Sequence, residues 1–91
     1  VFKVAGKMFA LSGLEHSPSK VNLKCDPERA IDLRAEYDDI IAGWHMSKKH
    51  WNTITIEGNI PNNLITELID HSYELVVQSF TLKKQRELGF L

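Results

Sequence analysis

A short segment near the middle of the chain contains the residue types that are best suited to binding or catalysis. Two lysines and two histidines lie in or beside a predicted turn, with a tryptophan on each side: Trp44-His45-Met46-Ser47-Lys48-Lys49-His50-Trp51-Asn52-Thr53. Lysines neutralise phosphates, a tryptophan ring offers a face for base stacking, and Asn or Thr can hydrogen-bond to phosphates or base edges. The segment is therefore a candidate nucleic-acid site. As a hairpin, it would form a β-ribbon that could lie in a groove.

Two other interpretations of this segment stay open. The lysines can be solvated charges of an exposed turn, with the two tryptophans serving the core and the sheet face. The same groups can also form a site for a protein or a small anion.

A neighbouring predicted strand could extend this basic surface. In residues 20–25, Val21, Leu23 and Cys25 alternate with polar residues, which therefore point to the opposite face of the strand. These outward residues can equally be edge charges that prevent association between sheets. The complete predicted nucleic-acid site comprises Lys48, Lys49, Trp51, His50, Lys24, Lys20 and Asn22.

Cys25 raises the possibility of thiol chemistry. It directly precedes Asp26, the predicted N-cap of a helix, where the helix partial charges can lower a thiol pKa. Its alternation with Val21 and Leu23 instead predicts a buried, inert thiol. The sequence contains no neighbouring His–acid arrangement, Gly-rich phosphate loop, nucleophile elbow or metalloprotease motif. We therefore predict no catalytic residues and no enzymatic activity.

Metal binding is a further possibility. The spacing of His45 and His50 matches neither a zinc motif nor a histidine pair on a helix face. Glu28, Asp32 and Glu36 form an acidic row that could attract a hard cation, but such a row is typical of a solvated helix face. We predict no metal site and no cofactor.

Composition narrows the class of protein. A chain of 91 residues is long enough for one domain. With 43% apolar and 25% charged residues, its composition is typical of a soluble globular protein. No apolar run approaches the roughly 18 residues of a membrane span, and the N-terminal residues do not have the pattern of a signal peptide. The single cysteine excludes an internal disulfide and is typical of the cytoplasm.

The net charge of −1 hides an uneven distribution along the chain. Residues 1–25 carry four lysines and one acid, and residues 40–56 carry Lys48 and Lys49 and no acid. Residues 26–39 carry six acids against two arginines, and residues 57–75 carry four acids and no lysine or arginine. Lys83, Lys84 and Arg86 form a basic tail, which we interpret as a solvated end that favours the helix dipole. The pattern predicts a basic sheet layer and an acidic helical layer.

The elements that would position these residues follow from periodicity and turn signals. A hairpin is predicted from residues 1–4 and 7–11 around Ala5-Gly6, with Phe2, Val4, Phe9 and Leu11 on one face. A loop, a strand at 20–25 and a helix from Asp26-Pro27 to about residue 40, ended by Gly43, follow. Strands at 44–46 and 51–57 flank a turn at 47–50, and the last helix begins at Pro61.

The last helix has the clearest pattern. Its apolar band is opposed by Glu67, Asp70, Glu74 and Gln78, and consists of Leu64, Ile65, Leu68, Ile69, Tyr73, Val76, Val77 and Phe80. We expect Leu68, Ile69, Tyr73 and Val76 to be buried against Phe9, Leu23, Ile54 and Ile56. Together these elements predict an α+β fold, an antiparallel sheet with helices packed on one face.

Four stretches together resemble the MmcQ/YjbR-like family of small bacterial proteins: FKVAGKMFAL at 2–11, VNLKCDPERA at 21–30, GWHMSKKHWNTI at 43–54 and ELIDHSYELV at 67–76. The resemblance covers nearly the whole chain. It implies a frataxin-like (CyaY-like) "double wing" α+β fold and a family generally described as predicted DNA-binding. Family members usually begin with an additional helix and a short strand, so residues 1–91 are expected to form a single domain that lacks them.

The leading hypothesis is a cytoplasmic bacterial protein that binds nucleic acid, DNA above all, through a basic sheet and turn surface, with no membrane partner. The alternative is a protein-interaction or regulatory module that uses the same surface on an acidic protein partner. Metal handling is a weaker third possibility, which rests only on analogy with the frataxin fold.

Overall fold

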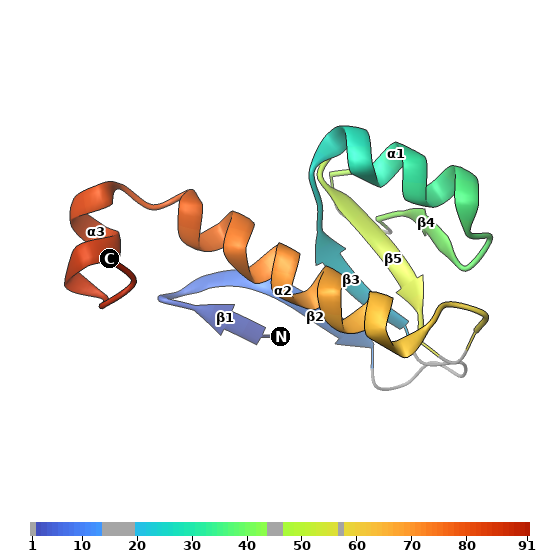
Figure 1. Ribbon diagram of the computed structural model, residues 1–91, viewed down its shortest axis with the longest axis horizontal. Coiled ribbons are helices and arrows are strands. Elements are labelled where there is room, and N and C mark those ends of the chain that lie inside the picture. Colours follow the sequence, from blue (N-terminus) through green and yellow to red (C-terminus); the bar gives the residue numbers. More distant parts are fainter. Residues whose placement is uncertain (1, 14–19, 44–46, 57) are drawn as a thin grey trace.

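Five strands form one antiparallel sheet in the order β1-β2-β3-β5-β4 (Figure 1). The computed structural model describes residues 2–13, 20–43, 47–56 and 58–91. The strands are β1 (Phe2–Val4), β2 (Lys7–Gly13), β3 (Lys20–Lys24), β4 (Ile40–Ala42) and β5 (Trp51–Thr55), and the helices are α1 (Pro27–Glu36), α2 (Asn62–Gln78) and α3 (Leu82–Glu87).

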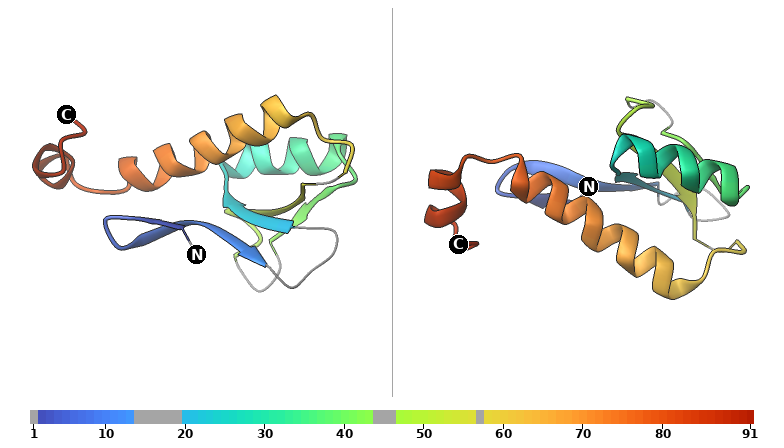
Figure 2. Two further views of the ribbon diagram at one scale, coloured as in Figure 1. Left: turned by 90° about the horizontal axis from the view of Figure 1, so that it is seen from below. Right: turned by 45° about the horizontal axis from the view of Figure 1, so that its top comes forward.

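Helices α1 and α2 lie side by side on one face of this sheet (Figure 2). The buried core lies between the two layers and contains residues of both helices and of the four strands β2 to β5. The predicted α+β class, with helices on one face of an antiparallel sheet, is therefore confirmed. None of the helices that the structure describes is both long and apolar enough to cross a membrane.

The first hairpin forms where it was predicted, but its register differs. Ala5 and Gly6 have φ angles of 47° and 83°, the positive values that a tight two-residue hairpin turn requires. The pairing then shifts between Phe2 and Lys3, which leaves Phe9 as an extra residue on β2. As a result Ala10 is buried in the core, and Leu11 faces the other side beside Asn22. The prediction that Leu11 shares one face with Phe2, Val4 and Phe9 was wrong because of this bulge.

The strand β3 and the start of α1 match the prediction. Val21 and Leu23 are buried while Lys20, Asn22 and Lys24 are half-buried on the opposite face. Asp26 caps α1 by accepting a hydrogen bond from the backbone N–H of Arg29 (3.2 Å), and proline occupies the first helical position.

Helix α1 ends earlier than predicted. It stops at Glu36, Tyr37 is extended, and Ile40–Ala42 forms the edge strand β4 instead of a last helical turn. The backbone carbonyl of Asp39 accepts from Thr55 N–H (3.0 Å), and its carboxylate accepts from Asn59 N–H (2.8 Å). Pairing with β5 and these bonds outweigh the helical spacing of Ile40 and Ile41. The predicted strand at 44–46 lies outside the described residues.

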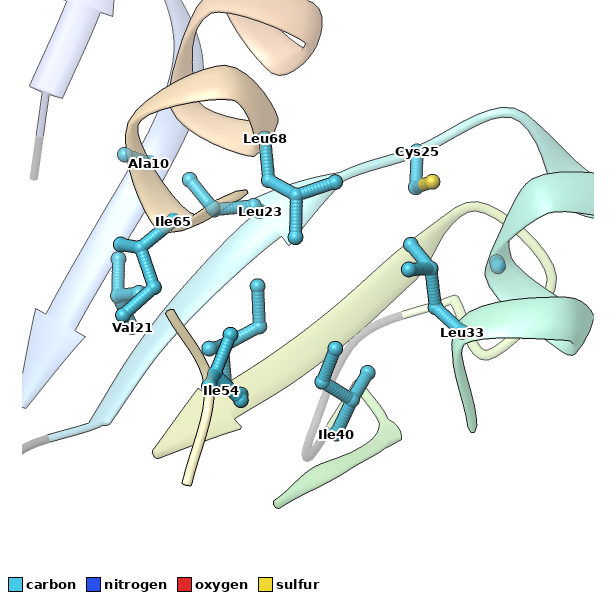
Figure 3. Close-up of a cluster of buried hydrophobic side chains, with 11 residues drawn as sticks. Ala10, Val21, Leu23, Cys25, Leu33, Ile40, Ile54, Ile65 and Leu68 are labelled. Atoms are coloured by element: carbon cyan, nitrogen blue, oxygen red, sulfur yellow. The ribbon is translucent and has the colours of Figure 1, made fainter. Parts of the chain in front are cut away.

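Helix α2 begins after Pro61 and buries one stripe: Ile65, Leu68, Ser72 and Val76. Leu68 and Val76 are buried as predicted, and Tyr73 is half-buried. Ile69 is 36% exposed, because it lies at the edge of the stripe, and Ile56 is 38% exposed beyond the end of β5. The expectation that both are buried was wrong. Figure 3 shows Leu68 and Ile65 directed toward Leu23 and Ile54.

The basic tail contains a third helix that the sequence did not predict. Helix α3 is capped by Thr81, whose hydroxyl accepts from Lys84 N–H (3.1 Å). Phe90, beyond its end, packs edge-on against Tyr73 of α2, with 6.2 Å between the ring centroids. The segment after α3 is therefore attached to α2 through Phe90, and α3 itself extends beyond the sheet (Figure 1).

Ser72 connects α2 to two strands and was not singled out from the sequence. Its side chain is fully buried, donates a hydrogen bond to Phe9 C=O (2.6 Å) and accepts one from Lys24 N–H (2.8 Å). The pairing of β2 with β3 ends at Ala10 and Leu23, so the hydroxyl bridges the next two backbone groups. Ser72 therefore continues the hydrogen bonding between β2 and β3 beyond the end of their pairing.

Substituting Leu68 tests the packing of α2. Leu68→Ala should lower the free energy of unfolding by about 2–5 kcal/mol, because it leaves a cavity in the core. Ile69→Ala, its exposed neighbour, should cost clearly less. Chemical denaturation of both variants measures the difference, and equal losses would contradict the observed orientation of the helix.

Ser72→Ala should lower the free energy of unfolding by about 1–3 kcal/mol, because it leaves two buried backbone groups without partners. Thr66→Ala removes an exposed hydroxyl from the same helix and should stay within about 0.5 kcal/mol of the wild type. A Ser72→Ala melt that matches the wild type would show that the bridge carries no stability.

Cys25 should react slowly with a thiol reagent in the native protein. The residue is 4% exposed, and burial raises the pKa of its thiol despite the nearby Arg29. A smaller thiolate fraction and restricted access both slow the reaction, since the thiolate is the nucleophile. Stopped-flow labelling with an aromatic disulfide, with and without denaturant, measures this. Equal rates in the two conditions would revive a reactive thiol.

Candidate functional site

The pairing of β3 with β5 brings the two predicted parts of the site together. In this register Lys24 is directly opposite Trp51, Asn22 is opposite Thr53 and Lys20 is opposite Thr55. Directly opposite residues of an antiparallel pair have their side chains on the same face. Because Leu23 and Ile54 face the helices, all of these side chains lie on the outer face of the sheet, away from α1 and α2.

The turn at 47–50 places its basic residues beside this pair. Ser47 C=O accepts from the backbone N–H groups of His50 (3.3 Å) and Trp51 (3.0 Å), which closes the turn. His50 C=O accepts from Cys25 N–H (2.7 Å), which attaches the turn to the end of β3. Lys48, Lys49 and His50 are exposed there, and Trp51 is half-buried.

We call this group the β3–β5 cluster; it consists of Lys24, Lys48, Lys49, His50 and Trp51. Lys20 is not part of it, since three residues of strand lie between it and Lys24, which places the two lysines roughly 13 Å apart. Trp44, His45 and Met46 of the predicted segment lie outside the described residues. The structure therefore joins five of the seven predicted site residues at one end of the sheet.

Three polar residues of β3 and β5 are buried or hydrogen-bonded within the sheet: Asn22, Asn52 and Thr53. The Thr53 hydroxyl donates to the side-chain oxygen of Asn22 across the β3–β5 pair, and Thr53 is only 3% exposed. Asn52 is buried on the helix side of β5, so its amide cannot reach a ligand on the outer face. The idea that Asn52 and Thr53 hydrogen-bond to nucleic acid was therefore wrong, because burial makes both inaccessible.

Gly43 positions Trp51, a role that its interpretation as a helix terminator missed. Gly43 N–H donates to Trp51 C=O (2.8 Å), and a β-carbon on Gly43 would lie 2.7 Å from the Trp51 β-carbon. No larger residue fits without displacing the tryptophan. The signal in the sequence was that Gly43 directly precedes the segment Trp44–Met46. That Gly43 lies opposite Trp51 is known only from the pairing of β4 with β5.

The charges are separated between the two layers, as the sequence predicted. No acidic residue occurs in any of the five strands. The acids that the structure describes lie on the three helices, at the α1 cap or in the α1–β4 connection. Asp26 is the acid closest in sequence to the cluster, and its carboxylate caps α1.

Lys7 is an exception among the strand lysines. Its Nζ donates to Ser79 Oγ (3.2 Å) and lies 5.3 Å from the centroid of the Phe80 ring, so it packs against the end of α2. Arg29 is also engaged, in an ion pair with Glu67 (2.6 Å) that joins α1 to α2. The charges of the helical layer thus pair partly with one another.

Three observations bear on the metal and thiol alternatives. Over the described ranges, no group of three or more His, Cys, Asp or Glu side chains is placed to hold a metal ion. The Cys25 thiol is buried and has a raised pKa, opposite to the shift that a nucleophilic cysteine needs. His71 has a structural partner, since its Nε2 accepts from Asp26 N–H (3.3 Å).

Known proteins of similar sequence and structure share this architecture. The YjbR family model matches residues 1–75, which include all five strands, α1 and most of α2. Uncharacterized protein YbdF of Escherichia coli is 35% identical over 88 residues, 97% of this chain and 72% of the relative. Uncharacterized protein YjbR of Escherichia coli is 34% identical over 87 residues, 94% of this chain and 73% of the relative.

Two crystal structures extend the comparison. A Deinococcus radiodurans protein has a TM-score of 0.89 and 41% identity, covering 91% of this chain and 62% of its own. A Pseudomonas syringae protein has a TM-score of 0.68 and 28% identity, covering 78% of this chain and 68% of its own. The chain thus spans less than two thirds of the Deinococcus protein. With the matching family model and the two relatives above 30% identity, the chain belongs to the YjbR family.

Proposed function

We propose that the protein binds nucleic acid through the β3–β5 cluster. The observation that supports this most is the register of β3 and β5, in which Lys24 lies opposite Trp51 and directly beside the exposed Lys48-Lys49-His50 turn. Three lysines and one aromatic ring are thereby gathered from segments that are far apart in the sequence. This combination suits a polyanion whose repeating units are phosphates and flat bases.

The charge distribution favours one orientation of such a polyanion. The outer face carries lysines from strands that contain no acid, whereas exposed acids such as Glu28, Asp32 and Glu74 lie on the helical layer. A phosphate backbone is therefore attracted to one face of the molecule and repelled by the other. A net charge of −1 does not oppose binding, because phosphate contacts depend on the local charge.

Lysine contacts with phosphates release counterions, and this gives the sharpest test. Replacing both Lys48 and Lys49 by Ala should reduce the magnitude of the slope of log K against log salt by about 2 on duplex DNA. The stability should stay within about 0.5 kcal/mol, because both side chains are exposed in a turn. Fluorescence anisotropy at several salt concentrations, together with thermal melts, measures both quantities.

The chain offers a matched control. Lys83 and Lys84 are also adjacent and exposed, but they lie on α3, beyond the end of the sheet. Replacing both by Ala removes the same charge and should leave the salt slope nearly unchanged. Equal effects of the two double variants would show that only the net charge matters. If the wild type binds neither duplex nor single-stranded nucleic acid at about 50 mM salt, the proposed function fails.

A further inference from the structure

The position of β5 inside the sheet bears on the kind of nucleic acid that the cluster can accommodate. The major groove of a duplex admits an α-helix or a two-stranded ribbon that projects from the protein. Strand β5 is paired with β3 on one side and with β4 on the other, and the turn before it is closed by bonds to Ser47. Strand β5 is thus an internal strand of the sheet and not one strand of a separate two-stranded ribbon.

The helices provide no alternative element for a groove near the cluster. Helices α1 and α2 cover the opposite face of the sheet and carry the exposed acids Glu28, Asp32, Glu67 and Asp70 (Figure 2). Helix α3 is basic but has only six residues and lies beyond the sheet (Figure 1). Among the described residues, the elements around the cluster therefore offer a duplex contacts with its outer phosphates rather than an element that enters a groove.

We infer that the β3–β5 cluster binds single-stranded nucleic acid, with one base stacked on Trp51 and the adjacent phosphates on the lysines. This inference rests on the proposed function and makes its substrate class specific. In a single strand the bases are free to leave the stack and meet an aromatic side chain, whereas in a duplex their faces are covered.

The position of Trp51 is suited to this role. Its backbone is paired on both sides, with Lys24 opposite it on β3 and with Gly43 through the 2.8 Å hydrogen bond from Gly43 N–H. Gly43 has no side chain at the point where its β-carbon would meet that of Trp51. Trp51 is half-buried, so its ring is anchored and still partly accessible. Lys24 lies opposite Trp51, and Lys48 and Lys49 belong to the exposed turn that closes on the Trp51 backbone N–H, so all three lysines are available to the phosphates beside a stacked base.

The test compares three probes on the wild-type protein at about 50 mM salt. They are an oligothymidylate of about 12 nucleotides, the same backbone without bases, and a duplex of about 12 base pairs. We expect the oligothymidylate to bind at least about tenfold more tightly than the duplex. The abasic strand should bind roughly 5- to 100-fold more weakly than the oligothymidylate, because stacking is lost while the phosphates remain.

Variants of the tryptophan provide an independent readout. The Trp51→Phe variant keeps an aromatic face and should still prefer the oligothymidylate over the abasic strand. The Trp51→Leu variant should bind these two probes with equal affinity. Thermal melts verify that each variant is folded. The chain contains two tryptophans, so in a Trp44→Phe background the fluorescence reports on Trp51 alone. Oligothymidylate should quench it, and the abasic strand should not.

The outcomes separate this inference from the proposed function. Duplex binding as tight as single-strand binding, with no quenching, overturns the single-strand assignment and leaves the nucleic-acid proposal intact. Equal affinity for the abasic strand and the oligothymidylate removes the stacking role of Trp51. Absence of binding to all three probes rejects both proposals together.

Discussion

The buried hydroxyl of Ser72 is the interaction on which the arrangement of the sheet and α2 depends. It donates to Phe9 C=O on β2 and accepts from Lys24 N–H on β3, directly beyond the last pair of these two strands, Ala10 and Leu23. Without it, two backbone groups would be buried between the layers and unsatisfied, at a considerable cost in free energy. The same bond fixes the backbone of Lys24, whose side chain points to the opposite face and belongs to the β3–β5 cluster.

The two layers of the molecule therefore have different chemical roles that meet at β3. The helical layer carries the described acids, buries its apolar stripes and joins α1 to α2 through the Arg29–Glu67 pair. The outer face of the sheet carries Lys20, Lys24 and Trp51, and the five strands contain no acid. Because of this separation, the molecule has one basic face although its net charge is nearly zero. A ligand of repeating negative charge is oriented by that difference before it makes any close contact.

Close backbone contacts, more than the charges of the side chains, hold the residues of the cluster together. Lys24 and Trp51 become neighbours only through the β3–β5 register, and His50 C=O bonds to Cys25 N–H at the end of the same pair. Gly43 allows β4 to approach Trp51 where any side chain would collide with it. The buried thiol of Cys25, beside this junction, fills space in the core and has a raised pKa. Its place next to a helix start is thus explained by packing without any need for thiol chemistry.

Local signals in the sequence were sufficient wherever one element determines its own structure. The Ala5-Gly6 turn, the alternation from Lys20 to Cys25, the Asp26-Pro27 helix start and the apolar band of α2 all follow from residue type and spacing, and together with the family resemblance they predicted the α+β fold. They also identified the lysines and Trp51 as the residues best suited to binding a ligand.

The remaining features depend on which elements pair, and the tertiary structure decided them. Ile40 and Ile41 continue a helical pattern, yet pairing with β5 makes them a strand. Ser72 looks like a polar interruption of an apolar band, yet the end of the β2–β3 pairing leaves Phe9 C=O and Lys24 N–H for it to bridge. The proximity of Lys24 to Trp51 likewise follows from a strand register that no local pattern encodes. Register is a property of two segments at once, so their separate sequences cannot specify which side chains meet.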